Sequence, residues 1–251
     1  MAGAIHIGTS GWAYPHWRGV FFPPHLPQAE WLAFYTAHFR TVELNASFYR
    51  LPTEATIDRW HALAPPGFVY AVKASRLVTH LKRLAGCEEP LALFFARVRR
   101  LGEHLGPVLF QLPPRLAADV GLLTDFAGRL PVDLVHVFEF RDASWFTPKV
   151  RDCLADHGLA FCIHDHGGIA CPDWVTARTV YHRFHGFSRS RLGAYGPARL
   201  AGVAARMKAE AAAGHEVYAY FNNDAWGCAV ADARCLAGLL GTGEDVATAQ
   251  G

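Results

Sequence analysis

The stretch LVHVFEFRDASWFTPKVRDCLADHGLAFCIHD, residues 134–165, contains one complete strand–helix–strand unit. Leu134–Phe140 is rich in β-branched and aromatic residues, which favours a strand. Pro148–His157 follows as a helix, with its proline at an early helical position, where the missing N–H is tolerated. Leu159–Asp165 returns to an apolar run and predicts the next strand. This order of elements predicts a parallel sheet with helices packed against it.

The same alternation extends in both directions from this unit. Eight strands are predicted, at Ala4–Gly8, Thr41–Asn45, Phe68–Lys73, Pro107–Leu112, Leu134–Phe140, Leu159–Asp165, Thr179–His185 and Glu216–Phe221. Helices are predicted at Gln28–Phe39, Glu54–Leu63, Pro90–Leu105, Asp119–Arg129, Pro148–His157, Pro197–Ala213 and Trp226–Leu240, and the segment after the sixth strand is loop-like. Eight alternating units favour a single (β/α)8 barrel. We assign residues 1–241 to it and residues 242–251 to a frayed tail.

A doubly wound open sheet is the alternative architecture, and the first predicted turn argues against it. Gly8–Trp12 contains neither the Gly-x-Gly-x-x-Gly fingerprint of dinucleotide-binding folds nor the Gly-Lys-Ser/Thr of a phosphate loop. The sequence therefore predicts no nucleotide cofactor.

The composition indicates one folded domain. Of 251 residues, 51% are hydrophobic and 18% are charged, which excludes global disorder. The net charge, 24 − 22 = +2, is too mild for a dedicated nucleic-acid coat. Six cysteines without a Cys-x-x-Cys pair are typical of buried thiols in a reducing compartment. Without a signal peptide or a long apolar run, we expect a soluble cytoplasmic protein with no membrane partner, its oligomeric state left open.

Polar side chains gather where the predicted strands end, on the face expected to point into the barrel. Barrel enzymes build their active sites at this end. The residues concerned are Glu43, Asn45, Lys73, Gln111, Glu139, Arg141, Asp165, Arg183 and His185, followed after strand eight by Asn222, Asn223 and Asp224. Charged side chains are seldom buried unless they are paired or functional, so the repetition predicts a functional site.

The residue types in this set suggest roles. Glu139 and Asp165 are the predicted acid–base pair, with Glu43 as a further candidate and His185 as a proton shuttle. Lys73, Arg141 and Arg183 are predicted to hold an anionic group. Asn45, Gln111, Asn222 and Asn223, together with the aromatic Tyr49 and Trp12, are predicted to contact the substrate; the aromatic residues near the mouth either stack on it or plug the barrel.

Glu139, Asp165 and His185 also form a candidate metal triad, since carboxylates and imidazole suit Mn, Mg or Zn. The neighbouring cations already neutralise these acids, which argues against a bound divalent ion.

Binding of nucleic acid or a nucleotide, with or without phosphodiester hydrolysis, is the alternative function. The loop residues Arg189 and Arg191, the helix segment Arg97–Arg100 and the mouth aromatics favour it. A barrel whose site has decayed into a scaffold is a third alternative.

Taken together, several stretches resemble the YecE-like family, also called domain of unknown function 72. They are Gly8–Trp12 with Trp17 and Gly19, Glu43–Asn45 with Phe48–Pro52, Lys73 with Thr79–His80, Gln111–Pro114, Glu139–Arg141 with Ser144–Trp145, Asp165, Arg183–Gly186 and Phe221–Asp224. The resemblance spans Ile5 to Leu240 and implies a (β/α)8 barrel related to sugar isomerases, without supplying a reaction. Isomerase-like barrels carry a fourth ligand, Glu, on strand eight, where this chain has Asn222, Asn223 or Asp224; that departure weakens the metal-isomerase interpretation.

The sequence thus predicts an enzyme that acts by general acid–base chemistry, isomerase-like or lyase- or hydrolase-like, on a small anionic sugar or sugar phosphate.

Overall fold

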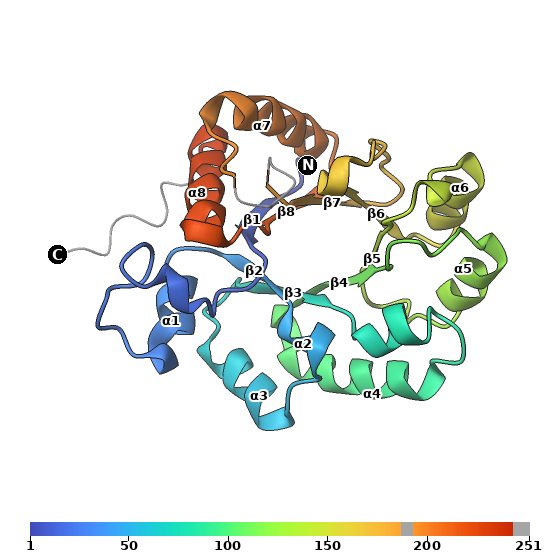
Figure 1. Ribbon diagram of the computed structural model, residues 1–251, viewed down its shortest axis with the longest axis horizontal. Coiled ribbons are helices and arrows are strands. Elements are labelled where there is room, and N and C mark those ends of the chain that lie inside the picture. Colours follow the sequence, from blue (N-terminus) through green and yellow to red (C-terminus); the bar gives the residue numbers. More distant parts are fainter. Residues whose placement is uncertain (187–192, 243–251) are drawn as a thin grey trace.

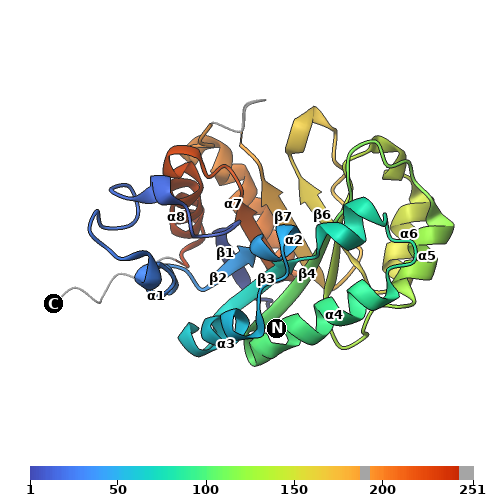
Figure 2. The ribbon, with the colours of Figure 1, turned by 60° about the horizontal axis from the view of Figure 1, so that its bottom comes forward.

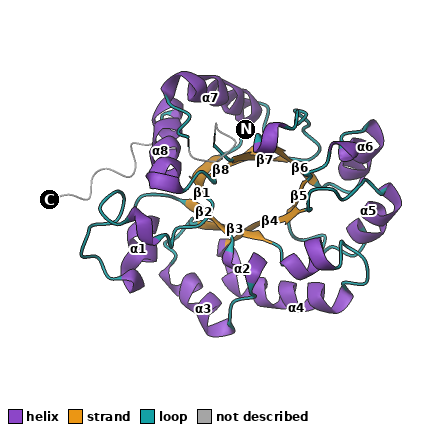
Figure 3. Ribbon diagram, viewed as in Figure 1, coloured by secondary structure: helices purple, strands orange, loops and turns teal. Residues whose placement is uncertain are grey.

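Eight parallel strands form the wall of a barrel in the computed structural model, which describes residues 1–186 and 193–242 (Figure 1, Figure 3). They are β1 (Ile5–Thr9), β2 (Thr41–Leu44), β3 (Val69–Lys73), β4 (Leu105–Gln111), β5 (His136–Glu139), β6 (Ala160–His164), β7 (Thr179–Phe184) and β8 (Glu216–Phe221). Each strand from β2 to β7 pairs with the next along the chain, and β8 pairs with both β7 and β1. The predicted (β/α)8 barrel is confirmed. The predicted tail beyond Thr242 and the basic loop with Arg189 and Arg191 lie outside the described residues.

The barrel closes between β1 and β2 at its carboxyl end. One parallel bridge joins Ser10 to Glu43 there, and the Gly11 N–H donates to the Glu43 carbonyl oxygen at 2.8 Å. Further down, Gly8 lets the two strands approach, because a Cβ atom at this position would stand 2.2 Å from the Thr41 carbonyl oxygen. Gly8 and Gly11, the glycines of the first turn, therefore contribute to the closure of the barrel.

Helices surround the sheet on its outer side (Figure 1). They are α1 (Trp31–Thr36), α2 (Ala46–Tyr49), α3 (Glu54–Leu63), α4 (Glu88–Val98), α5 (Val120–Ala127), α6 (Pro148–Asp156), α7 (Pro197–Ala212) and α8 (Cys228–Leu240). Side-chain caps start α3 at Thr53 and α6 at Thr147, where each hydroxyl accepts from a backbone N–H three residues on. Among the described residues, β6 is followed by a single 3-10 turn, His166–Gly168.

The helix predicted over Pro90–Leu105 is wrong in its second half. α4 ends at Val98, and a 3-10 segment, Arg99–His104, continues to the start of β4. Gly102 causes the change, because its φ of +56° is incompatible with a regular helix.

Two apolar layers form the core. The larger one lies between the sheet and the helices, and the smaller one fills the barrel with Ala71, Leu109, Val137, Ala160, Cys162, Tyr181, Tyr218 and Tyr220. The tyrosines of β7 and β8 occupy much of the interior, so β6 contributes the small side chains of Ala160 and Cys162.

This packing overturns one expectation. The sequence predicts Asp165 on the inward face of β6, but Phe161 and Ile163, which share its parity, belong to the outer layer under the helices. The inward positions of β6 are therefore Ala160, Cys162 and His164, and Asp165 falls on the other side of the alternation.

All six cysteines are free thiols. Within residues 1–186 and 193–242, no helix combines the length and apolar character that crossing a membrane requires.

Candidate functional site

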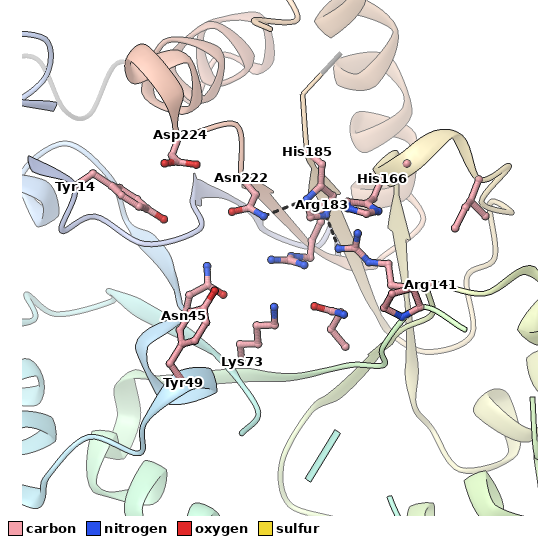
Figure 4. A pocket seen from close by; sticks show the side chains of 14 residues that line it. Tyr14, Asn45, Tyr49, Lys73, Arg141, His166, Arg183, His185, Asn222 and Asp224 are labelled. Carbon is pink, nitrogen blue, oxygen red and sulfur yellow. Dashed lines mark hydrogen bonds between the residues drawn. The ribbon is translucent and has the colours of Figure 1, made fainter. Parts of the chain in front are cut away.

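A cavity of about 560 Å³ opens at the carboxyl ends of the strands. Figure 4 shows its polar side chains pointing into one space from different strands. They are Tyr14, Asn45, Tyr49, Lys73, Gln111, Arg141, His166, Arg183, His185, Asn222 and Asp224. All of them except Tyr14 and His166 are among the residues that the sequence analysis places at this end of the barrel, so strand parity brings most of that set together.

Two arginines form the inner wall of this cavity, and two glutamates lie behind them. Arg183 donates to Glu43 at 2.7 Å and to Glu139 at 2.5 Å. Arg141 forms a further ion pair with Glu139. Both glutamates are 0% exposed and do not line the cavity, so a ligand meets the guanidinium groups and not the carboxylates.

Glu43 is held by two more donors. The Ser10 hydroxyl donates to one carboxylate oxygen at 2.6 Å, and the Tyr181 hydroxyl donates to the other at 2.7 Å. Side chains from β7 and from the residue after β1 therefore meet at the carboxylate of Glu43 on β2. The backbone of Glu43 also forms the bridge to Ser10 that closes the barrel.

The charges in this network reinforce one another. Burial alone would raise the pKa of Glu139, but the positive charges of Arg141 and Arg183 outweigh it and hold that pKa well below its ordinary value. Burial likewise opposes the charge of Arg183, and Glu139 and Glu43 reverse the effect and raise its pKa. The lowered pKa keeps Glu139 ionised, and both glutamates are enclosed behind the arginines, so the geometry does not favour Glu139 or Glu43 in the predicted acid–base role.

Lys73 is placed differently, because it ends in the cavity. Its Nζ lies 4.2 Å from the centroid of the aromatic ring of Phe48, a residue of the short helix α2. Burial, and then the positive charge of Arg183, lower the pKa of Lys73 to about 8. Near neutral pH this amine is therefore able both to accept and to give a proton.

His185 is a buried, neutral imidazole. Burial, followed by the positive charge of Arg183, holds its pKa well below the ordinary value. Nε2 lies 3.0 Å from a guanidinium nitrogen of Arg141, which donates to it. Nδ1 lies 3.1 Å from the amide nitrogen of Asn222. These contacts suit the orientation of Arg141 better than the predicted shuttling of protons.

Asp165 lies outside the cavity lining, as the alternation along β6 requires. One of its oxygens accepts from the His185 backbone N–H at 2.7 Å, and the other accepts from the Tyr195 hydroxyl. The Tyr195 N–H in turn donates to Asp232 on α8 at 3.1 Å. Asp165 thus anchors the end of β7, and its position does not suit the predicted acid–base pair.

The predicted metal triad does not fit a metal ion. Two guanidinium groups occupy Glu139, two donors occupy Asp165, and both ring nitrogens of His185 have protein neighbours. In the part of the chain that the structure describes, the ligand atoms of these three residues do not gather within 4.8 Å of one another.

Two predicted binding residues lie away from the cavity. Trp12 packs edge-on against Trp60, with ring centroids 5.5 Å apart, and lines a separate pocket. Asn223 is fully buried and donates to Asp232 at 2.8 Å. Because Tyr220 points into the barrel, the alternation carries Asn222 to the cavity and turns Asn223 away.

Some aromatic residues near the mouth are placed to stack on a ligand, and others pack inside the protein. Tyr49 is 80% exposed and lines the cavity, where it is free to stack on a ligand. Trp17 and Trp145 are buried and serve packing. Tyr14 lines the cavity, while its hydroxyl donates to the Ser10 carbonyl oxygen at 2.5 Å.

The basic helix segment expected to favour nucleic acid is engaged in protein contacts. Arg99 pairs with Asp133 at 2.7 Å, and Arg100 pairs with Asp58 at 2.6 Å. Arg97 donates to the Pro52 carbonyl oxygen at 2.5 Å. Each of these guanidinium groups therefore has a protein partner.

Tyr181 and Ser10 are part of the network but are not among the predicted site residues. Tyr181 shares the inward parity of Arg183 on β7, and this parity was the available signal. Nothing in the local sequence marks Ser10, because its partner Glu43 is 33 residues away.

These features define a (β/α)8-barrel protein with a cation-lined cavity in the position where such barrels bind small molecules. The family model "Protein of unknown function DUF72" matches residues 6–250. The chain belongs to this family.

Relatives agree with this assignment. The UPF0759 protein YunF of Bacillus subtilis is 30% identical over 153 residues, which cover 57% of this chain and 53% of that protein, so the match spans about half of the relative's length. A DUF72 family protein of Thermotoga maritima is 27% identical with a TM-score of 0.83, covering 94% of this chain and 99% of the other. A DUF72 family protein of Enterococcus faecalis, 19% identical with a TM-score of 0.83 over 95% of this chain and 96% of the other, shows the same fold.

Proposed function

We propose that the protein is an enzyme that binds a small anionic molecule, such as a sugar phosphate, and transfers protons on it through Lys73. One observation carries the proposal: Lys73, Arg141 and Arg183 line the cavity, while the glutamates that balance the two arginines lie behind them. Guanidinium and ammonium groups bind phosphate or carboxylate through charge-assisted hydrogen bonds. The ligand's anionic end is therefore expected on this wall.

The other side of the cavity suits hydroxyl groups. Figure 4 shows Tyr14 and Asp224 across the cavity from Arg141, with Asn45 and Tyr49 beside Lys73. Carboxylate, amide and phenol groups accept and donate hydrogen bonds to polyols. A ligand with an anionic group at one end and hydroxyl groups at the other complements both sides.

The chemistry follows from the lowered pKa of Lys73, about 8. As a free amine it accepts a proton from a carbon or hydroxyl group of the ligand, and as an ammonium group it returns one. Isomerisation of a sugar phosphate needs two proton transfers: Lys73 carries one proton between neighbouring carbons, and a second proton passes from the hydroxyl oxygen to the carbonyl oxygen. Glu43 and Glu139 then act as positioning residues that keep Arg183 and Arg141 in place.

Thermal unfolding tests the proposal with defined probes. Ribose 5-phosphate and inorganic phosphate are expected to raise the melting temperature, because a ligand that binds only the folded state stabilises it, by about 2.7 kcal/mol at a hundredfold excess over Kd. Neutral ribose is expected to have little effect.

Matched variants locate the effect. Lys73→Met and Arg141→Ala are expected to lose most of the stabilisation by ribose 5-phosphate. Lys149→Met, which changes an exposed lysine on α6, is expected to keep it. Equal stabilisation by ribose and ribose 5-phosphate, or an undiminished response in Lys73→Met, would contradict the proposal.

A further inference from the structure

A second cluster of chemically active side chains lies at the opposite end of the barrel. His61 belongs to the last turn of α3, and Glu103 and His104 directly precede β4. Figure 2 shows α3 and α4 side by side. One ligand atom from each of the three residues lies within 4.8 Å of the others, and no other group of this kind occurs in residues 1–186 and 193–242.

Both imidazoles are held by their Nδ1 atoms. His61 Nδ1 donates to the Leu101 carbonyl oxygen at 3.1 Å, and His104 Nδ1 donates to the Phe68 carbonyl oxygen at 2.9 Å. With the proton on Nδ1, the Nε2 lone pair of each ring is available. Histidines that bind metals are oriented in this way, by a hydrogen bond from the other ring nitrogen to a carbonyl or carboxylate.

Glu103 supplies the third donor. Its Oε1 lies 3.7 Å from Nε2 of His104, while its side chain is 75% exposed. Around a tetrahedral zinc ion, with bonds of about 2.0–2.2 Å, neighbouring ligand atoms stand roughly 3.3–3.5 Å apart. Binding therefore requires the three ligand atoms to close from separations of at most 4.8 Å to this distance, and the exposed Glu103 side chain is free to move inward.

Gly102 explains why these residues meet. Its φ of +56° and ψ of −130° turn the chain just before Glu103, in a conformation that side chains disfavour. A Cβ atom at this position would also stand 3.2 Å from Cε1 of His61. Glycine thus permits both the turn and the approach of the imidazole to it.

We propose that His61, Glu103 and His104 bind a zinc ion, with water as the fourth ligand. Two imidazoles and one carboxylate suit Zn²⁺, which favours nitrogen and oxygen donors in tetrahedral geometry. The ion joins α3 to the segment that leads into β4. Residues at the amino end of a barrel serve stability rather than catalysis, so the site is structural.

Calorimetric titration of the untagged, chelator-treated protein with zinc chloride tests this site. The wild-type chain is expected to bind one zinc ion and to melt at a higher temperature when loaded. His61→Gln and Glu103→Gln are expected to weaken binding by about tenfold to a hundredfold or more, as losses around metal sites do. Both altered side chains are at least partly exposed, so these variants are expected to fold.

His215→Gln is the matched control. This partly exposed histidine also contacts a backbone carbonyl oxygen through Nδ1, that of Arg178 at 3.2 Å, but belongs to no such cluster among the described residues. It is expected to bind zinc like the wild type. Cobalt, as a spectroscopic substitute, is expected to give the strong visible absorption of tetrahedral coordination in the wild type and to lose it in His61→Gln. A folded wild-type chain that binds no zinc, or unchanged affinity in His61→Gln, would overturn the proposal.

Discussion

Lys73 is a cationic residue of the cavity that can lose its charge near pH 8. Burial and Arg183 lower its pKa to about 8, while Glu139 and Glu43 act in the opposite direction. The ammonium form therefore predominates below pH 8 and is lost as the pH rises through 8. An anion held partly by Lys73 must bind less tightly in that range.

Sulfate is a suitable probe of this effect, because its own charge stays constant between pH 7 and 9.5. Its affinity is expected to fall roughly tenfold over this range, the worth of one charged hydrogen bond. Lys73→Arg keeps its charge and is expected to bind sulfate with little pH dependence. The same loss of affinity in wild type and Lys73→Arg would assign the titration to another group.

The sequence predicts which residues lie near the cavity, but not which of their side chains reach it and which are buried behind others. Strand parity places Lys73, Gln111, Arg141 and Arg183 in the cavity lining, because side chains alternate along the ends of these strands. Strand parity does not show which charged side chains line the cavity and which lie behind the lining. Glu139 and Arg141 share one face, and only the contacts of Arg183 with Glu43, 140 residues away, show that the carboxylates lie behind.

At the scale of elements, the junction of β1 and β2 is held by a single bridge, between Ser10 and Glu43. A Cβ atom at Gly8 would stand 2.2 Å from the Thr41 carbonyl oxygen of β2. Gly8→Ala would place a methyl group against a backbone oxygen that cannot move without displacing β2. We expect a loss of about 1–3 kcal/mol in the free energy of unfolding, the usual cost of overpacking.

Urea unfolding measures this loss, and Gly202→Ala on α7 is the control. Nothing lies within 4 Å of a Cβ atom there, and alanine is the better helix former, so this variant is expected to gain about 0.5–1 kcal/mol. A Gly8→Ala protein as stable as the wild type would show that the junction is not tightly packed.

Element boundaries follow the sequence where local signals are strong. α3 and β8 match their predicted ranges, Glu54–Leu63 and Glu216–Phe221, since a capping threonine and a dense β-branched and aromatic run define them. The inward side of β6 cannot be predicted from the sequence of β6 alone. Its inward side chains are small because the tyrosines of β7 and β8 fill the interior, and no pattern within β6 reveals this.

For the whole molecule, the two proposed sites lie at opposite ends of one rigid wall. Lys73 ends β3 at the cavity, whereas the histidine cluster lies where β3 and β4 begin. Perturbations that share no contacts usually add to within about 0.3–0.5 kcal/mol. We therefore expect zinc and ribose 5-phosphate to stabilise the protein additively.

Melting curves with each ligand alone and with both together check this expectation. Phosphate affinity is expected to change by less than about twofold on zinc loading, which corresponds to that additive limit. A larger change would mean that β3 or β4 transmits strain along the barrel.

The carboxylate of Glu43 has a consequence for the history of such barrels. It holds Arg183 for the ligand, while its residue forms the bridge to Ser10 that closes the wall. A mutation of Glu43 is expected to affect both folding and activity, so selection acts on both effects. Lineages that acquire new substrates must therefore vary elsewhere. The exposed side chain of Tyr49, which reaches the cavity from a short surface helix, offers one such position.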